Sequence, residues 1–139
     1  MNKEFIISSD KLMIKIEDVV ALLRNSYWAA ARSKEIIIKS IENSFCFGVY
    51  HKDKQIGFAR MITDYATYAY LCDVIINKEY RGQGIGKELV RYILEHPDLE
   101  DVKSLWLTTK DAHKLYEKYG FESVKDTSKL MIKRKKAIH

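Results

Sequence analysis

The residues with the clearest chemical potential are three glycines at alternate positions, Gly82, Gly84 and Gly86, between an apolar segment and an amphipathic one. A glycine loop that joins a strand to a helix directs several main-chain N–H groups into one concavity, where the helix dipole adds about half a positive charge. Glycine lets the oxygen atoms of an anion approach the main chain, and Arg81 and Lys87 add cationic side chains. The pattern predicts an anion-binding loop; a tight turn that only needs small residues is the alternative.

The spacing of these glycines excludes two common nucleotide-binding loops. A dinucleotide-binding fingerprint needs GxGxxG, whereas this loop reads GxGxG. A P-loop needs a glycine five residues before its Gly-Lys pair and Ser or Thr after it, where this chain has Arg81 and Glu88. The predicted anion therefore belongs to another class of ligand.

The elements that must position the loop follow from the periodicity of apolar residues. Residues 68–76 alternate like a strand, and a helix is predicted from about residue 84, with Ile85, Leu89 and Ile93 on one face. Residues 104–109 read as a further strand, and a short helix within 111–120 ends at Gly120. The strands before and after the first of these helices should be parallel.

The rest of the chain predicts a mixed α/β fold. A short strand at 4–8 precedes helices at about 16–26 and 34–43, the second with Ser33 as its N-cap. Strands are predicted at about 45–51 and 55–63, and a closing pair at 121–126 and 129–134. The order βααβββαβαββ indicates a mixed, mostly antiparallel sheet of about six to seven strands with helices on both faces.

Composition limits the classes of protein that fit. The chain has 139 residues, is 47% hydrophobic and 31% charged, and has a net charge of +5, which suits one globular domain over residues 1–139. No apolar run is long enough to span a membrane and no secretion signal is recognisable, so a cytoplasmic location is expected. Cys46 and Cys72 are expected to be buried free thiols, no metal site is predicted, and the basic cluster at 133–136 is expected to be solvated.

Two motifs resemble those of one known family. The segment RGQGIG at 81–86 resembles the R/Q-x-x-G-x-G/A signature of the GCN5-related N-acetyltransferases, the GNAT superfamily. The segment AHKLYEKYGF at 112–121 resembles that family's Ala-x-x-Leu-Tyr-x-x-x-Gly-Phe segment. One position departs from the pattern, because Thr109 stands where many relatives carry Asn, so an amide contact to the cofactor is not expected there. The resemblance extends over nearly the whole chain and implies a single-domain GNAT fold.

The resemblance also implies a ligand for the loop, the pyrophosphate of acetyl-CoA, with no metal. In the family, main-chain donors of this loop wrap the pyrophosphate, and the pantetheine arm lies along the preceding strand like an added strand. The cofactor-binding residues expected by position are Val74, Ile75, Ile76, Arg81, Gly82, Gln83, Gly84, Ile85, Gly86 and Lys87.

The implied reaction is acetyl transfer from CoA to a primary amine of a small molecule or protein by direct attack. Tyr116 matches the family's helix tyrosine and is the expected proton donor to the thiolate, since a phenol and a thiol have neighbouring pKa values. The main-chain N–H groups near Val74 would bind the oxyanion. Asp73 is the expected base, although it could instead anchor a loop, with Asp64 as a weaker candidate and water as the third option.

The acceptor region is expected within NSYWAAARS, between the first two helices. Tyr27 and Trp28 would stack on an acceptor and Arg32 would pair with a carboxylate, or all three could be core and rim residues. The competing class of function is a non-catalytic acyl-CoA sensor or a basic nucleic-acid-binding module of the same fold. No basic-aromatic stripe favours nucleic acid, no membrane partner is expected, and a homodimer is left open.

Overall fold

The computed structural model describes residues 4–135, so Lys136 of the basic cluster and His139 lie outside the described residues. The chain divides at residue 108/109 into two compact units, which are described separately. The first unit contains a five-stranded sheet in the order β1-β2-β3-β4-β5. Its strands are β1 (Ile6–Ser8), β2 (Phe45–His51), β3 (Lys54–Thr63), β4 (Tyr68–Ile76) and β5 (Ser104–Leu107).

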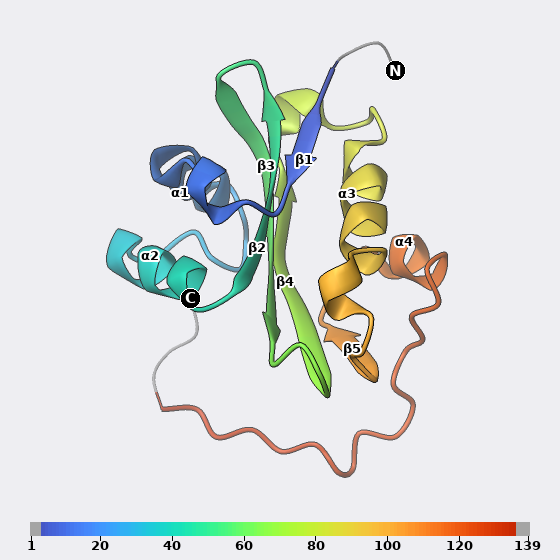
Figure 1. The fold of residues 1–139 in the computed structure, drawn as a ribbon. Helices are drawn as coiled ribbons and strands as arrows, with labels where there is room; N and C mark the ends of the chain where they lie inside the picture. The colour runs from blue at the N-terminus through green and yellow to red at the C-terminus, as the bar shows by residue number, and fades with distance from the viewer. Residues whose placement is uncertain (1–3, 136–139) are drawn as a thin grey trace. The chain divides into compact units, whose positions relative to one another are not determined.

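Helices cover both faces of this sheet, as the sequence predicts. The helices α1 (Ile16–Arg24) and α2 (Lys34–Glu42) lie on one face and α3 (Ile85–Leu94) on the other (Figure 1). Short 3-10 helices, η1 (Lys11–Met13), η2 (Lys78–Tyr80) and η3 (Pro97–Leu99), occupy connections between them. The predicted N-cap of α2 is confirmed, because Ser33 Oγ accepts a hydrogen bond from Ile36 N–H at 3.2 Å.

Each helical layer packs on the sheet through side chains of alternating strand positions. Under α1 and α2 the core includes Leu23, Ile37, Phe58 and Ile75, each at most 5% exposed. On the opposite face Phe47 of β2 meets Tyr92 of α3, with ring centroids 6.2 Å apart. Alternation places successive strand residues on opposite faces, so β2 and β3 are buried on both sides.

The strand β4 pairs with β5 over only part of its length. The two strands are parallel, as predicted, with partners that run from Tyr68 and Ser104 to Leu71 and Leu107. The strand β5 ends there, whereas β4 continues to Ile76. The last residues of β4 therefore have an edge that β5 does not cover, as the strand-like pantetheine arm implied by the family resemblance requires.

A β-bulge occurs in β4 where the pairing with β5 stops. On the β3 side, Arg60 is opposite Cys72 but Phe58 is opposite Ile75, so two residues of β4 face Ala59. The first of them, Asp73, has φ +57°, in the left-handed region that non-glycine residues seldom adopt. A carboxylate in this conformation inside a strand requires specific partners, which are described below.

The prediction of a closing pair of strands is wrong. In the second unit the described residues contain α4 (His113–Glu117), and no strand follows β5 within residues 108–135. In the segments 121–126 and 129–134 the apolar residues Val124, Met131 and Ile132 are exposed. A strand is stable only when a partner strand supplies hydrogen bonds and a buried face. The sheet therefore has five strands among the described residues rather than six to seven.

Candidate active site

The glycine loop between β4 and α3 owes its conformation to two of its glycines. Gly82 has φ +78° and Gly84 has φ +83°, values that side chains with a Cβ seldom adopt. A Cβ built on either glycine would meet no atom within 4 Å, so packing does not exclude a side chain there. These glycines are therefore needed for the backbone conformation, and the space above them is open.

Gly86 lies in the first turn of α3 and is required by neither conformation nor packing. Its φ is not positive, and a Cβ on it would meet only Ile76 Cγ1, at 3.9 Å. The first helical hydrogen bond runs from Glu88 N–H to Gly84 O at 3.1 Å, so the N–H groups of Ile85 and Gly86 have no partner within the helix. Open space above free donors at a helix start fits the approach of an anion such as a pyrophosphate.

The main chain of β4 turns alternate residues toward the edge that β5 leaves open. Asn77 N–H donates to Ile56 O of β3 at 2.7 Å. Because strand residues alternate between the two sides, Ile75 also bonds toward β3, whereas Val74 and Ile76 face the open edge. Arg81 Nε donates to the carbonyl of Ile76 at 3.1 Å, which is consistent with that orientation. Of the three predicted main-chain contacts, Val74 and Ile76 are thus better placed than Ile75.

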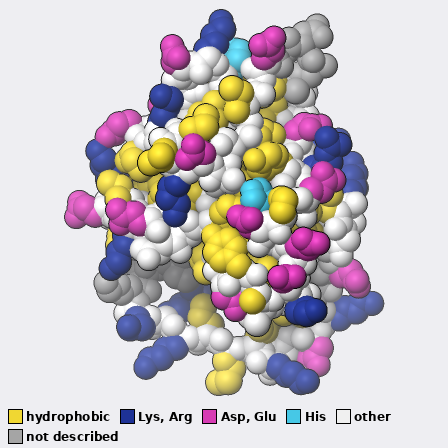
Figure 2. Space-filling model, viewed as in Figure 1, with side chains coloured by type: hydrophobic (Ala, Val, Ile, Leu, Met, Phe, Trp, Pro, Cys, Tyr) yellow, Lys and Arg dark blue, Asp and Glu magenta, His cyan; other side chains and the backbone are white. Residues whose placement is uncertain are grey.

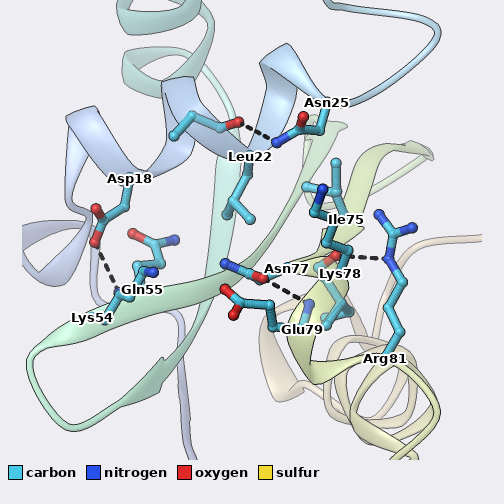
Figure 3. A pocket seen from close by; sticks show the side chains of 12 residues that line it. Asp18, Leu22, Asn25, Lys54, Gln55, Ile75, Asn77, Lys78, Glu79 and Arg81 are labelled. Carbon is cyan, nitrogen blue, oxygen red and sulfur yellow. Dashed lines mark hydrogen bonds between the residues drawn. The ribbon is translucent and has the colours of Figure 1, made fainter.

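A pocket of about 180 Å³ adjoins this end of β4 on the side of α1 (Figure 3). Its wall includes Leu22 of α1, Asn25 at the C-cap of α1 and Ile75 of β4, and it shares Ile75, Ile76 and Arg81 with the predicted cofactor-binding residues. Some polar groups of the pocket already form hydrogen bonds within the protein. Asp18 Oδ2, for example, accepts from the main-chain N–H of Gln55 at 3.0 Å. No sequence pattern predicts this pocket, because its residues come from three separate segments of the chain.

Four side chains converge on the bulge, and they include three of the predicted site residues. Asp73 Oδ1 accepts from Trp28 Nε1 at 2.8 Å. Its Oδ2 accepts from Arg32 Nη1 at 2.8 Å and from Arg60 Nε at 2.7 Å. The Asp73 side chain is 2% exposed, against 14% for Arg32 and 12% for Arg60. We call Trp28, Arg32, Arg60 and Asp73 the bulge cluster.

The surroundings of Asp73 keep its carboxylate ionised. Burial alone would raise the pKa of Asp73, but the hydrogen bond and charge of Arg60, the charge of Arg32 and the hydrogen bond of Trp28 lower it overall. A carboxylate held by three donors with a lowered pKa is a weak proton acceptor. The geometry therefore favours the anchoring alternative for Asp73 over the role of base.

Asp64, the weaker candidate for the base, is also committed to local structure. Its carboxylate accepts from the hydroxyl and N–H of Thr67 and from the N–H of Ala66, and these hydrogen bonds lower its pKa. They hold the turn between β3 and β4, at the opposite end of β4 from the glycine loop. Asp64 is thus a turn residue in this structure.

Two members of the predicted acceptor region are brought together with Asp73, and the third lies outside the cluster. Trp28 and Arg32 each donate a hydrogen bond to Asp73. Tyr27 is 63% exposed, and its ring packs edge-on against the ring of Trp28 with centroids 5.1 Å apart. Sequence reasoning missed Arg60, which also donates from Nη1 to Ser44 Oγ at 3.0 Å. An arginine inside the apolar strand segment GFARMI needs a buried carboxylate as its partner. This requirement could have identified Arg60 as a site residue from the sequence.

Tyr116, the predicted proton donor, belongs to the second unit. It lies on α4, is 8% exposed, and packs against Phe121 with ring centroids 5.8 Å apart. Burial raises the pKa of its phenol, which keeps the hydroxyl protonated at neutral pH. Thr109, at the place of the usual Asn, accepts from Ala112 N–H through Oγ1 at 3.0 Å and so stabilises the turn that precedes α4.

Other reactive groups are inert or dispersed. Cys46 and Cys72 are free thiols, and burial raises the pKa of each to about 11, so neither is a thiolate at neutral pH. Over residues 4–135 no three His, Cys, Asp or Glu side chains are grouped to hold a metal ion. Lys and Arg are interspersed with Asp and Glu on the face of the described residues in Figure 2, without one continuous basic stripe. No helix of the described residues is long and apolar enough to cross a membrane.

Comparison with known proteins decides the family. The model of the acetyltransferase (GNAT) family matches residues 16–121, a span that includes the glycine loop, the bulge and α4. The chain belongs to the GNAT family. A solved structure from Xanthomonas campestris pv. campestris, described as an acetyltransferase of the GNAT family, is 36% identical with a TM-score of 0.89, and the match covers 94% of this chain and 93% of that one.

Curated GNAT relatives are named as acetyltransferases. One from Gibberella zeae is 26% identical over 98% of this chain and 93% of its own length. GCN5-related N-acetyltransferase 2, chloroplastic, from Arabidopsis thaliana is 31% identical over 76% of this chain, but the match spans only 42% of the plant protein. The GNAT fold and an acyltransferase activity are therefore shared with these relatives.

Proposed function

We propose that this GNAT protein is an acetyl-CoA-dependent N-acetyltransferase that moves the acetyl group to the primary amine of a small molecule or a protein. The observation that carries the proposal is the open glycine loop at the start of α3, next to the uncovered edge of β4. The glycine loop at the helix start suits an anion, and the strand edge suits an extended chain that carries amides. Acetyl-CoA, with a pyrophosphate and a pantetheine arm, carries both kinds of group in that order.

The cofactor contacts follow from this arrangement. The pyrophosphate binds the main chain from Gly82 to Lys87, with Arg81 as a neighbouring cation at the end of β4. The pantetheine amides bind the main-chain groups of Val74 and Ile76 that face the open edge. Acetyl-CoA supplies a thioester, and the N–H of Val74 is the donor to the oxygen atom that becomes negative in the transition state.

Proton transfer is divided between a side chain and solvent. The attacking amine must be neutral, and it loses its proton to water, because Asp73 is held ionised by three donors. As the bond between the acetyl carbon and sulfur breaks, the Tyr116 hydroxyl gives its proton to the thiolate. Asp73 acts as a positioning residue, because it fixes the bulge that turns Val74 toward the open edge.

A thiol-release assay tests the proposed function. The protein is incubated with acetyl-CoA and a panel of amino acids, polyamines, aminoglycosides and peptides with free N-termini, and the release of CoA is followed. We expect release that depends on both the protein and at least one amine, with the acetylated amine identified by mass spectrometry. Binding of acetyl-CoA without release to any amine would instead indicate the sensor alternative, and no binding would overturn the proposal.

A further inference from the structure

The bulge cluster has an unbalanced charge. Arg32 and Arg60 carry two positive charges, and Asp73 carries one negative charge, so one positive charge is in surplus. In the described residues no other carboxylate forms an ion pair with either arginine. One guanidinium is enough to neutralise Asp73, so the second leaves the partly buried cluster with a net positive charge that a bound anion would neutralise.

The two arginine side chains are partly exposed, at 14% for Arg32 and 12% for Arg60. Arg32 uses only Nη1 on Asp73, and Arg60 uses Nε on Asp73 and Nη1 on Ser44. Among the described residues, the Tyr50 hydroxyl is the single buried side-chain polar atom without a hydrogen-bond partner. The remaining guanidinium nitrogens are therefore not fully buried, and Arg32 has more of them to offer than Arg60.

The cluster also lies beside the expected point of reaction. Asp73 directly precedes Val74, whose N–H faces the open edge of β4 and, under the proposed function, binds the thioester oxygen. An attacking amine must come within about 3–3.5 Å of the thioester carbon, so its substituents pass close to the guanidinium groups. Exposed Tyr27, packed on Trp28, adds an apolar surface at the same place.

We propose that the acceptor of this enzyme is an amine that also carries a carboxylate or phosphate group, and that Arg32, assisted by Arg60, binds this anion. The inference rests on the proposed function and deepens it. A bidentate contact between a guanidinium and a planar or tetrahedral oxyanion is among the strongest polar contacts available to a protein. The same surplus charge disfavours polycationic acceptors and favours the neutral form of the bound amine, which is the form that attacks.

Matched pairs of amines test the proposal. One pair is an amino acid and its amide, a second is phosphoethanolamine and ethanolamine, and spermidine is the polycation. We expect kcat/KM to be about tenfold or more higher for the anionic member of at least one pair, from the energy of a hydrogen bond between charged groups. The two pairs separate carboxylate from phosphate recognition. Equal rates within both pairs, a preference for spermidine, or no acetylation of either anionic amine would overturn the inference.

A substitution assigns the effect to Arg32. Arg32→Gln should raise KM for the anionic amine about tenfold more than KM for its neutral partner, so that the preference within the pair is lost, whereas Arg32→Lys should retain part of that preference. The matched control is Arg91→Gln, because Arg91 is exposed on α3 and bonds only Glu88. An unchanged preference in Arg32→Gln would contradict the assignment; if that variant fails to fold, the wild-type pairs decide alone.

The same experiments separate the two levels of the account. Acetyl-CoA affinity is measured by calorimetry for each variant, with amine absent. If the wild-type protein does not bind acetyl-CoA, the proposed function fails. If it binds acetyl-CoA and acetylates neutral or polycationic amines as well as anionic ones, the proposed function stands and the anionic-acceptor inference fails.

Discussion

Asp73 and Arg60 form a buried ion pair, with Oδ2 and Nε 2.7 Å apart, at the point where β4 leaves regular pairing with β3. The backbone of Asp73 is in the left-handed region, a conformation that costs about 1–3 kcal/mol for a residue other than glycine. Two arginines and a tryptophan offset this cost by donating to the carboxylate. The backbone conformation of the bulge and the hydrogen bonds of the bulge cluster therefore depend on each other.

Asp73→Asn should destabilise the protein by about 3–5 kcal/mol, because removing one partner of a buried ion pair leaves the other charge uncompensated. Urea unfolding followed by circular dichroism measures the change. Asp101→Asn, at an exposed position, is the control and should change stability little. A variant of Asp73 as stable as the wild type would contradict the anchoring role.

The contribution of Asp73 to stability should depend on pH. Its pKa is lowered in the folded protein, so the stabilisation is fully present above the unfolded value of about 3.9 and is lost as pH falls below it toward the folded pKa. The difference in unfolding free energy between wild type and Asp73→Asn should therefore be constant from pH 5 to 7 and shrink below about pH 4. A difference that grows on acidification would contradict a lowered pKa of Asp73 in the folded protein.

Alanine at two of the loop glycines should have opposite effects on stability. Gly84→Ala should destabilise the fold by about 1–2 kcal/mol, because Gly84 has φ +83°. Gly86→Ala should stabilise it by about 0.5–1 kcal/mol, because Gly86 is helical and a Cβ meets nothing closer than 3.9 Å. Thermal unfolding without ligand distinguishes the two, and equal effects would mean that the loop conformation is not as described.

Tyr116→Phe should lower kcat by about 100-fold or more, since the thiolate loses its proton donor, while acetyl-CoA affinity changes little. Because burial raises the pKa of Tyr116, the wild-type kcat should fall with rising pH only above the ordinary tyrosine value of about 10. Steady-state kinetics against pH tests both points. An unchanged kcat in Tyr116→Phe would show that another group or water donates the proton.

Most helices and strands were predictable from the sequence, whereas strand pairing and the contacts between side chains of different elements were not. Periodicity placed β2, β3, β4 and α3 within a few residues, because each has a strong alternating or helical pattern. The segments 121–126 and 129–134 were also predicted as strands, yet strand formation depends on a partner that local sequence does not specify. For the same reason Asp73 and Arg32 were predicted as separate site residues, whereas the pairing of Asp73 with Arg60 depends on the register of β3 on β4.

Calorimetric titration with acetyl-CoA is the decisive measurement for the proposed cofactor site. We expect saturable one-to-one binding to the wild type and loss of binding in Gly86→Glu, which would place a carboxylate where the pyrophosphate is proposed to bind, at a position where a Cβ fits the fold. Ala66→Glu, which adds the same charge on the exposed turn at the far end of β4, should bind normally. A wild-type protein that does not bind acetyl-CoA, or a folded Gly86→Glu variant that binds it equally well, would contradict the claim.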